Sequence, residues 1–446
     1  MSGTRRGIAC ALLVVLVSCD KGSGPGYSPR VPVTSPTSAN SRVIALVGTL
    51  SGPDSAWGND AFEAAQAAVA VLNREIGEDE RSFELVTLDD EGDPQTASDL
   101  IENVVTTYPT VGIVFSGPPQ ALPASEDVLA EAGVPALLQT GDLLAQNLLT
   151  PHAFQFSPPY TWQADALGRY LFDDRGYTRV GSLTRAGASG QSARRALQSA
   201  FAAQGHRLAA SELLPETGGG LDRALTRLRK ARVQAIVVEG APRAEDKALA
   251  ALEDRNAVYV TRTEAKRSGR PFTRRWNPQI AGFDTLIAPQ VAHLAAGSVA
   301  AESYARGAHY LPIPSFESFR RAFSDWWGNR VGSPLGQERR AFESVLAIGW
   351  AARRVPSSSD ADLAQVLERL DGKRFGGLDI SFSASDRAAT EPSTVGLWTV
   401  PSAADDIPND DIPTDLFWVP LDRTFTGRGN HTSVLRPDLP YLFPRA

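Results

Sequence analysis

Short apolar runs alternate with longer segments of helical periodicity along most of this chain. The first run, Val43 to Gly48, precedes a segment from Asn59 to Arg74 in which apolar residues recur every three or four positions. Similar runs follow at Phe83 to Leu88, Val111 to Phe115 and Val134 to Leu138, with helices predicted to open near Pro94 and after Pro118-Pro119. Because strands buried on both faces read as continuous apolar runs, this alternation predicts a parallel sheet covered by helices.

The same alternation starts again after the proline-rich stretch Ser157-Pro158-Pro159. Strands are predicted at Arg179 to Leu183, Leu208 to Leu214 and Ala235 to Glu239. Helices are predicted at Trp162 to Phe172, Leu221 to Ala231 and Glu245 to Asp254, and a further helix follows the loop at 184–190 and ends at Gln204. Amphipathic helices predicted at Phe316 to Asn329, Arg339 to Arg353 and Ala361 to Leu370 are expected to return to the first lobe. The expected fold is α/β, with two doubly wound parallel-sheet lobes joined by a multi-strand hinge.

The N-terminal segment has the pattern expected of an export signal. Arg5 and Arg6 precede an apolar run that ends in Leu16-Val17-Ser18-Cys19 and is too short for a membrane span. This ending resembles the lipobox of bacterial lipoproteins, in which the cysteine is lipidated; an ordinary secretory signal with a chance cysteine is the alternative. The expected parts are a signal peptide (1–18), a flexible tether (19–41), lobe 1 (42–152 with 286–370), lobe 2 (153–285 with 371–404) and a C-terminal extended strap (405–446).

Composition and charge narrow the function classes. The only cysteines are Cys10, inside the leader, and Cys19, so a mature lipoprotein keeps no disulfide and no thiol nucleophile. The formal charge of −7 is not gathered into one block. A nucleic-acid partner is not expected, because that function needs a concentrated basic surface.

Motifs for catalysis and metal binding are absent from the sequence. There is no Gly-x-Ser-x-Gly elbow, no His-Glu-x-x-His and no Walker loop, and the five histidines lack ligand spacing. The acidic cluster Asp89 to Asp93 lacks the twelve-residue calcium loop and is interpreted as carboxylates at a helix start. We therefore expect no enzyme activity, no cofactor and no metal.

Several short stretches lie at loop positions of the predicted lobes. They are Val47 to Pro53 with Trp57-Gly58, Asp89 to Pro94, Ser116 to Pro118, Val134-Pro135, Gly187 to Gln191 and Phe375 to Leu378. In order and spacing they resemble type I periplasmic binding proteins, specifically the branched-chain amino-acid (Leu/Ile/Val) receptors of ABC importers. The resemblance covers roughly residues 43 to 400.

This resemblance implies a ligand site between the lobes. Trp57 would contact the ligand side chain, and Ser116, Gly117 and Thr140 would hold an α-carboxylate. The position agrees with the general rule that ligands bind beyond the carboxyl ends of parallel strands, where helix N-termini favour anions. Ser116 and Thr140 could instead serve only as caps or turn residues, whereas a loop position next to the cleft is expected for Trp57.

The second-lobe half of the site departs from the family pattern. Ser189 stands where an aromatic residue is common, and the loop Gly240 to Arg243 also lacks one. The acid that pairs with the ligand ammonium would be Glu264 or, less well aligned, Glu239. A wider or more polar pocket follows, so a peptide, an amide, a urea-like compound or an aromatic acid fits as well as leucine.

The function implied is that of an extracytoplasmic solute-binding lipoprotein. It would bind a small amino-acid-like or amide ligand by hinge closure, deliver it to an ABC permease, and be tethered to the bacterial cell membrane through lipidated Cys19, on the periplasmic or cell-surface side. The alternative is an envelope lipoprotein of the same fold that senses a ligand or regulates a partner protein without transport.

Overall fold

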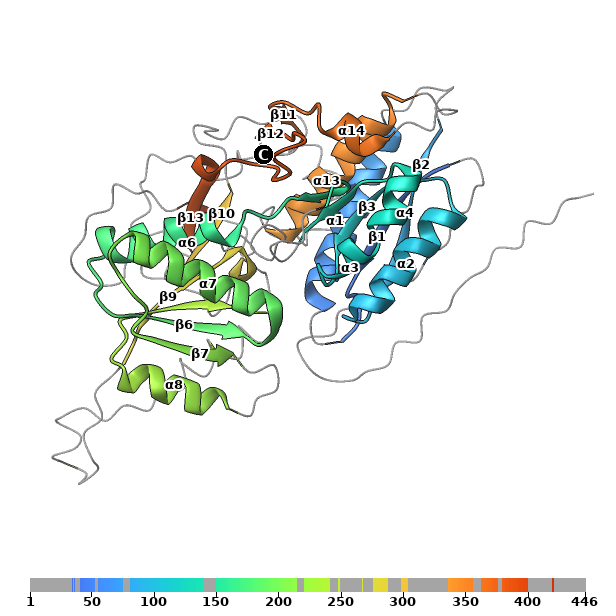
Figure 1. Cartoon of the computed structure of the whole chain (residues 1–446). Helices are drawn as coiled ribbons and strands as arrows, with labels where there is room; N and C mark the ends of the chain where they lie inside the picture. The colour runs from blue at the N-terminus through green and yellow to red at the C-terminus, as the bar shows by residue number, and fades with distance from the viewer. Residues whose placement is uncertain are drawn as a thin grey trace, which may run out of the picture.

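The computed structural model describes residues 34, 36, 41–52, 55–74, 81–139, 150–214, 220–240, 248, 267, 276–287, 298–303, 336–355, 362–375, 379–399 and 419–420. These residues form two α/β lobes that lie side by side (Figure 1). In the described part of the chain, no helix is long and apolar enough to cross a membrane.

Five parallel strands form the sheet of lobe 1, in the order β2-β1-β3-β4-β5. Their bounds are β1 (Arg42–Gly48), β2 (Phe83–Asp89), β3 (Thr110–Ser116), β4 (Ala136–Leu138) and β5 (Ala153–Gln155). Ile44 in β1 lies opposite Leu85 in β2 and Gly112 in β3. The parallel sheet predicted from the apolar runs is confirmed.

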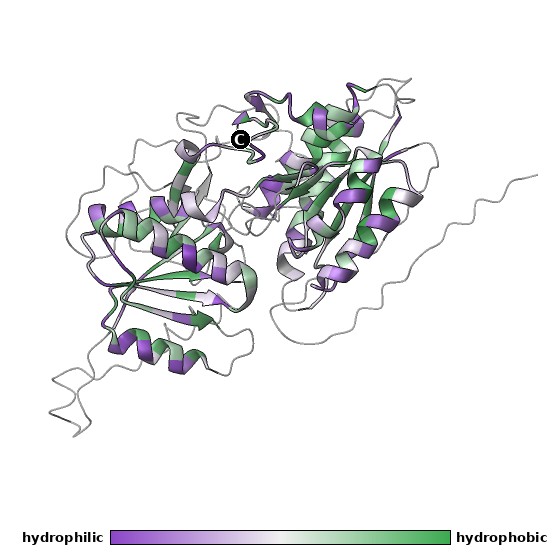
Figure 2. Cartoon of the chain, in the orientation of Figure 1, coloured by the Kyte–Doolittle hydropathy of each residue, from purple (hydrophilic) through white to green (hydrophobic). Residues whose placement is uncertain are grey.

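Helices cover both faces of this sheet. One face carries α1 (Ser55–Arg74), α13 (Gln337–Ala352) and α14 (Leu363–Leu367), and the other carries α2 (Pro94–Thr107), α3 (Ala121–Ala124) and α4 (Glu126–Ala132). Alternate strand residues enter two separate cores, as with Ile44 on the α1 face and Val43 on the α2 face. Figure 2 shows the resulting apolar sheet between helices whose outer faces are polar.

The sheet of lobe 2 has the order β7-β6-β8-β9-β10-β13-β14. The parallel strands are β6 (Val180–Arg185), β7 (Ala210–Leu214), β8 (Ala235–Glu239), β9 (Gln279–Gly282) and β10 (Val299–Ser303), and the antiparallel strands are β13 (Val395–Thr399) and β14 (Val419–Pro420). Helices α6 (Tyr160–Gly168) and α7 (Gly187–Ala203) pack on one face and α8 (Leu221–Lys230) on the other.

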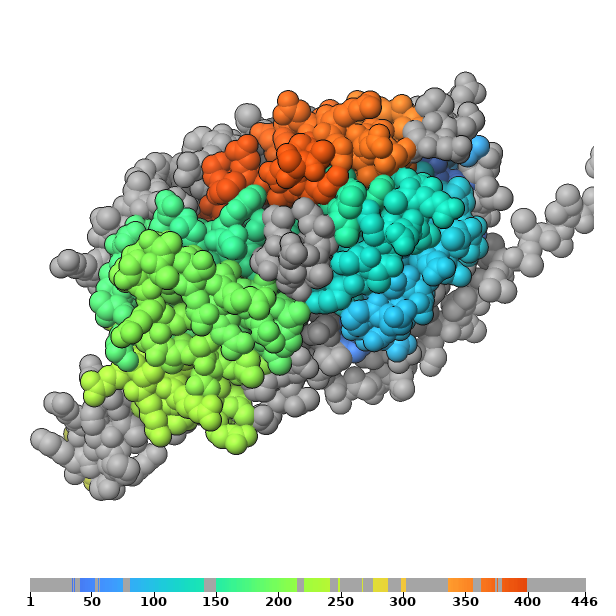
Figure 3. All heavy atoms as spheres, in the orientation of Figure 1, coloured from blue at the N-terminus to red at the C-terminus, as the bar shows by residue number. Residues whose placement is uncertain are grey.

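The described elements change lobe three times, between β5 and α6, between β10 and α13, and between β12 (Asp379–Ile380) and β13. The last crossing runs beside β5, where Gln155 accepts from the amide of Ala389 and donates its own amide to the carbonyl of Arg387. Figure 3 shows the corresponding orange residues spanning the upper side of both lobes. This connection is the multi-strand hinge that the sequence predicts.

Three segments lie in a different lobe from the one predicted for them from the sequence. β5 pairs with β4 in the first sheet, and β10 pairs with β9 and β13 in the second. The hairpin of β11 (Lys373–Arg374) and β12 belongs to lobe 1, because Phe375 and Ile380 pack in its core. Short apolar segments near a crossing suit either sheet, so their pattern does not reveal which sheet they join.

Other elements differ at their ends. Helix α1 begins at Ser55 and not at Asn59, and α6 continues into a π-helical turn over Arg169–Asp174. The helices predicted at 245–254 and 316–329 lie outside the described residues, as do the leader and most of the tether and strap. Of the tether, Thr34 is described, and its amide and hydroxyl donate to the carbonyls of Thr87 and Leu85 in edge strand β2.

Candidate functional site

The carboxyl ends of strands from the two sheets meet between the lobes. β3 of lobe 1 ends at Ser116, whereas β6 and β8 of lobe 2 end at Arg185 and Glu239. The Cζ atom of Arg185 lies 4.9 Å from the ring centre of Trp57, which belongs to lobe 1. Because ligands of open α/β sheets bind beyond such strand ends, this meeting point is the candidate site.

Trp57 lies in the first turn of α1, so its predicted position in a loop is wrong. The residue is 8% exposed. A Cβ atom at Gly58 would stand 2.3 Å from the carbonyl oxygen of Thr49, so the neighbouring glycine lets this turn pack against the loop after β1. The turn is thereby fixed with the indole beneath the guanidinium of the opposite lobe, a cation–π arrangement.

Arg185 and Glu239 form an ion pair at the rim of lobe 2. Nε of Arg185 donates to Oε1 of Glu239 at 2.9 Å, and the backbone amide of Arg185 donates to Oε2 at 3.3 Å. The Glu239 side chain is fully buried and that of Arg185 is 16% exposed. Burial raises the pKa of Glu239, and the charge of Arg185 acts in the opposite direction.

Asp90 joins the loops at the carboxyl edge of lobe 1. Its Oδ1 accepts from the hydroxyl of Thr49 and from the amide of Gly92, both at 2.8 Å, while Oδ2 faces Gly117, where an added Cβ would be 2.0 Å away. Burial raises the pKa of Asp90 to about 6. The carboxyl group therefore fixes three neighbouring loops in position.

The rest of the acidic cluster is structural, as predicted. Asp93 caps α2 by accepting from the amide of Thr96 at 2.8 Å, and this bond lowers the pKa of Asp93. Asp89 accepts from the amides of Leu50 and Glu91, each at 3.0 Å.

Ser116 is buried at the end of β3 and does not cap the following helix. Its Oγ accepts from Nε2 of Gln337 at 3.0 Å, whereas α3 has Gln120 at its N-cap position. The capping alternative for Ser116 is therefore wrong. Its contact with a ligand stays a prediction, because the hydroxyl proton can still be donated.

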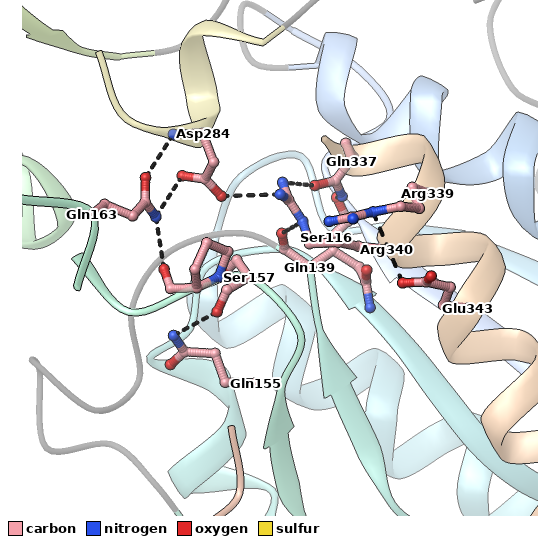
Figure 4. Close-up of polar contacts among 11 residues, drawn as sticks. Ser116, Gln139, Gln155, Ser157, Gln163, Asp284, Gln337, Arg339, Arg340 and Glu343 are labelled. Atoms are coloured by element: carbon pink, nitrogen blue, oxygen red, sulfur yellow. Dashed lines mark hydrogen bonds and ion pairs between the residues drawn. The ribbon is translucent and has the colours of Figure 1, made fainter. Parts of the chain in front are cut away.

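A polar chain continues from Gln337 across the lobe boundary (Figure 4). Arg340, one turn further along α13, donates through Nε to the carbonyl of Gln139 at 3.1 Å, and its Nη1 lies 3.1 Å from Oδ2 of Asp284 in lobe 2. Asp284 in turn exchanges two hydrogen bonds with the side chain of Gln163 in α6. This chain ties the start of α13 to the second lobe.

Glu338 adds a buried carboxyl at the start of α13. Its pKa is raised well above the ordinary value by burial and then by the nearby charges of Asp60 and Glu63 in α1. Among the described residues, no group of three or more histidine, cysteine, aspartate or glutamate side chains is arranged to hold a metal ion.

The remaining predicted site residues are only partly placed. Ser189 lies in the first turn of α7 and is half-buried, so it belongs to a helix and not to a loop. Gly117 follows Ser116 directly, at the edge that faces Asp90. Thr140, Glu264 and Cys19 lie outside the described residues.

Sequence reasoning missed Arg185, Asp284, Gln337 and Arg340 as members of this region. Arg185 could have been found, because a charged residue that ends a buried strand stands at the ligand-binding edge. The other three have no local signal, since their significance comes from contacts between distant segments.

Comparisons with known proteins agree with this architecture. Residues 43–262 match the sequence model of a family described as periplasmic binding protein. A sequence comparison with curated proteins gives no match.

Solved structures share the fold at low sequence identity. A type 1 periplasmic binding protein from Bordetella pertussis Tohama I superposes with a TM-score of 0.65 at 19% identity, covering 82% of this chain and 98% of that one. The branched-chain amino acid transporter substrate-binding protein LivJ from Streptococcus pneumoniae, in complex with isoleucine, gives 0.62 at 18%, covering 81% and 95%. A possible leucine/isoleucine/valine-binding protein from Rhodopirellula baltica SH 1 gives 0.66 at 16%, covering 88% and 99%.

The two-lobed fold, the hinge with its three crossings and the match over residues 43–262 lead to one assignment. The chain has the two-lobed fold of the type I periplasmic binding proteins, and its residues 43–262 match the periplasmic binding protein family.

Proposed function

We propose that this chain is an extracytoplasmic solute-binding protein that captures a small molecule between its lobes and presents it to an ABC permease. The contact between Arg185 and Trp57 carries the proposal, because it joins the loop-bearing edges of both sheets. A similar structure supports the same proposal, since LivJ from Streptococcus pneumoniae was solved in complex with isoleucine. No catalytic step is part of the proposal.

The membrane anchor belongs to the same proposal. Leu16-Val17-Ser18-Cys19 supports lipidation at Cys19, with the following residues as a tether between lipid and lobe 1. Mass spectrometry of the detergent-extracted protein should find diacylglyceryl on an N-terminal Cys19. Cys19→Ala should abolish that mass and release the protein from membranes, whereas an unmodified chain cleaved elsewhere would reject the anchor.

Ligand capture is testable by thermal stabilisation. A library of amino acids, amides, ureas, short peptides and carboxylic acids is screened by differential scanning fluorimetry, because a ligand that binds only the folded state raises Tm. At 100 times its dissociation constant a ligand adds about 2.7 kcal/mol to stability. Mass spectrometry of small molecules that co-purify with the protein adds candidates to the library.

Two tryptophans provide a matched pair of variants. Trp57→Ala should lower the ligand affinity at least about tenfold, since it removes a cation–π contact made across the lobes. Trp350→Ala removes a similar contact inside lobe 1, where Cζ of Arg354 lies 3.8 Å from the centre of the Trp350 ring. This variant should leave the ligand affinity unchanged. Stabilisation by a protein partner only would favour the sensor or regulator over the transport receptor.

A further inference from the structure

The rim of lobe 2 contains a carboxylate whose charge is already matched within the protein. Both carboxylate oxygens of Glu239 accept hydrogen bonds from Arg185, one from the side chain and one from the backbone amide. The pair has no net charge when Glu239 is ionised. When Glu239 is protonated, the rim is cationic.

Among the described residues of this rim, the carboxylate of Glu239 is thus already paired and offers no unmatched negative charge to a ligand ammonium. The ammonium would lie near the Arg185 guanidinium, and a buried cation without its own counter-ion is strongly disfavoured. The guanidinium is also fixed from the other side, because it lies over the Trp57 ring of lobe 1. Moving Arg185 away to expose Glu239 would break the ion pair and the contact between lobes together.

We propose that Arg185 is a specificity-determining residue, which makes this site select a small carboxylic acid that lacks an ammonium group over the corresponding amino acid. The inference rests on the proposed function and narrows its substrate class. Arg185 excludes the ammonium group, and it does not determine the apolar part of the ligand, which would contact the surface around Trp57. A carboxylate remains compatible with the site, because Arg185 and the N-terminus of α7 both favour negative charge.

Matched acids test this choice. Isothermal titration calorimetry of the full chain compares 4-methylpentanoate with L-leucine and 3-phenylpropanoate with L-phenylalanine, since each pair differs only in the ammonium group. The acid should bind at least about tenfold more tightly in any pair that binds. An amino acid that binds as tightly as its acid overturns the inference and leaves the proposed function standing.

If neither pair binds, the inference is tested on the ligand that the thermal-shift library identifies. A ligand without an ammonium group supports the inference, and one with an ammonium group overturns it. If no member of the library binds, the proposed function itself fails.

Variants then assign the preference to the ion pair. Arg185→Gln removes the cation and leaves the charge of Glu239 unmatched, so the ratio of acid to amino-acid affinity should fall at least about tenfold. Arg185→Lys keeps the cation and should keep the preference, which distinguishes charge from packing. Glu239→Gln leaves the charge of Arg185 unmatched, so the preference for the acid should be kept or increased; a lower ratio of acid to amino-acid affinity in this variant would contradict the assignment to Arg185.

An ion pair at the surface of lobe 2 supplies the control. Arg227 lies 3.0 Å from Glu212, and its side chain is 67% exposed. Arg227→Gln removes an arginine from an Arg–Glu pair away from the site, and should leave the affinity ratio unchanged. An equal change of ratio in Arg227→Gln and Arg185→Gln would contradict the assignment to Arg185.

Discussion

Arg340 and Asp284 form a buried ion pair between the lobes, with Nη1 and Oδ2 separated by 3.1 Å. The side chains are 4% and 3% exposed, and Gln163 donates a further bond to Asp284 at 3.0 Å. This ion pair, which Gln163 links to the crossing between β5 and α6, fixes the position of α13 relative to lobe 2. The pair is thus a second contact between the lobes, in addition to that of Trp57 with Arg185.

Breaking this pair should be costly from either end. Arg340→Met or Asp284→Asn leaves a buried partner without its counterpart, and each is expected to lower the free energy of unfolding by about 3–5 kcal/mol. The double variant should lose less than the sum, because the two residues act together. Urea denaturation measures all three, and losses no larger than the roughly 0–1 kcal/mol expected for Arg227→Gln would contradict the prediction.

Asp90 should make stability depend on pH. Its pKa is about 6 in the fold and near 3.8 when exposed, so the folded state binds the extra proton between these values. Stability contributed by this group is present below about pH 4 and falls as pH rises to about 6, by roughly 3 kcal/mol in total. Asp90→Asn should flatten the unfolding free energy over that range. An unchanged slope in the variant would show that Asp90 is not the titrating group.

The contact between Gly117 and Asp90 predicts a suppressor. Gly117→Ala places a Cβ 2.0 Å from Oδ2 of Asp90, so the loop must shift and both stability and ligand affinity should drop. Asp90→Ala removes the clashing carboxyl group. The double variant Gly117→Ala with Asp90→Ala should recover part of the affinity lost in Gly117→Ala, as measured by calorimetry. Additive losses would mean that the clash is relieved elsewhere.

Ser116→Ala separates packing from ligand contact. The variant leaves Nε2 of Gln337 without its acceptor, at a cost of about 1–3 kcal/mol, and should weaken the ligand as well. Ser344→Ala is the matched control, because its Oγ accepts from the buried amide of Gln139 at 2.7 Å and it lies further along α13. It should cost similar stability with unchanged affinity. Equal ligand affinity in the two variants would show that Ser116 does not contact the ligand.

The sequence predicts those parts of the fold that depend on local pattern. Runs such as 43–48 and 235–238 are apolar throughout, because each strand supplies residues to two cores, and the structure confirms both strands. The return of α13 to lobe 1 was also expected, although the pattern does not show that Arg340 at its start faces the other lobe.

The site was less predictable, because it depends on residues that are distant in the chain. A glycine next to Trp57 is typical of a loop, but in the structure Gly58 allows the first turn of α1 to pack closely against Thr49. Ser116 was identified from its position after β3, whereas its partner Gln337 could be identified only from the folded structure. Arg185 and Glu239 each stand at or just beyond the end of a predicted strand, but their pairing becomes visible only when the fold places these two parallel strands side by side.

Closure of the two lobes on a small ligand is tested most directly by an inter-lobe distance. Spin labels are attached to cysteines introduced at Asn103 in α2 and Arg223 in α8, both exposed, with Cys10 and Cys19 changed to serine. Pulsed electron resonance then gives the distance distribution with and without a ligand whose binding calorimetry has established. We predict a broad distribution in the free protein that becomes narrower and shorter at saturation; identical distributions in both states would contradict closure.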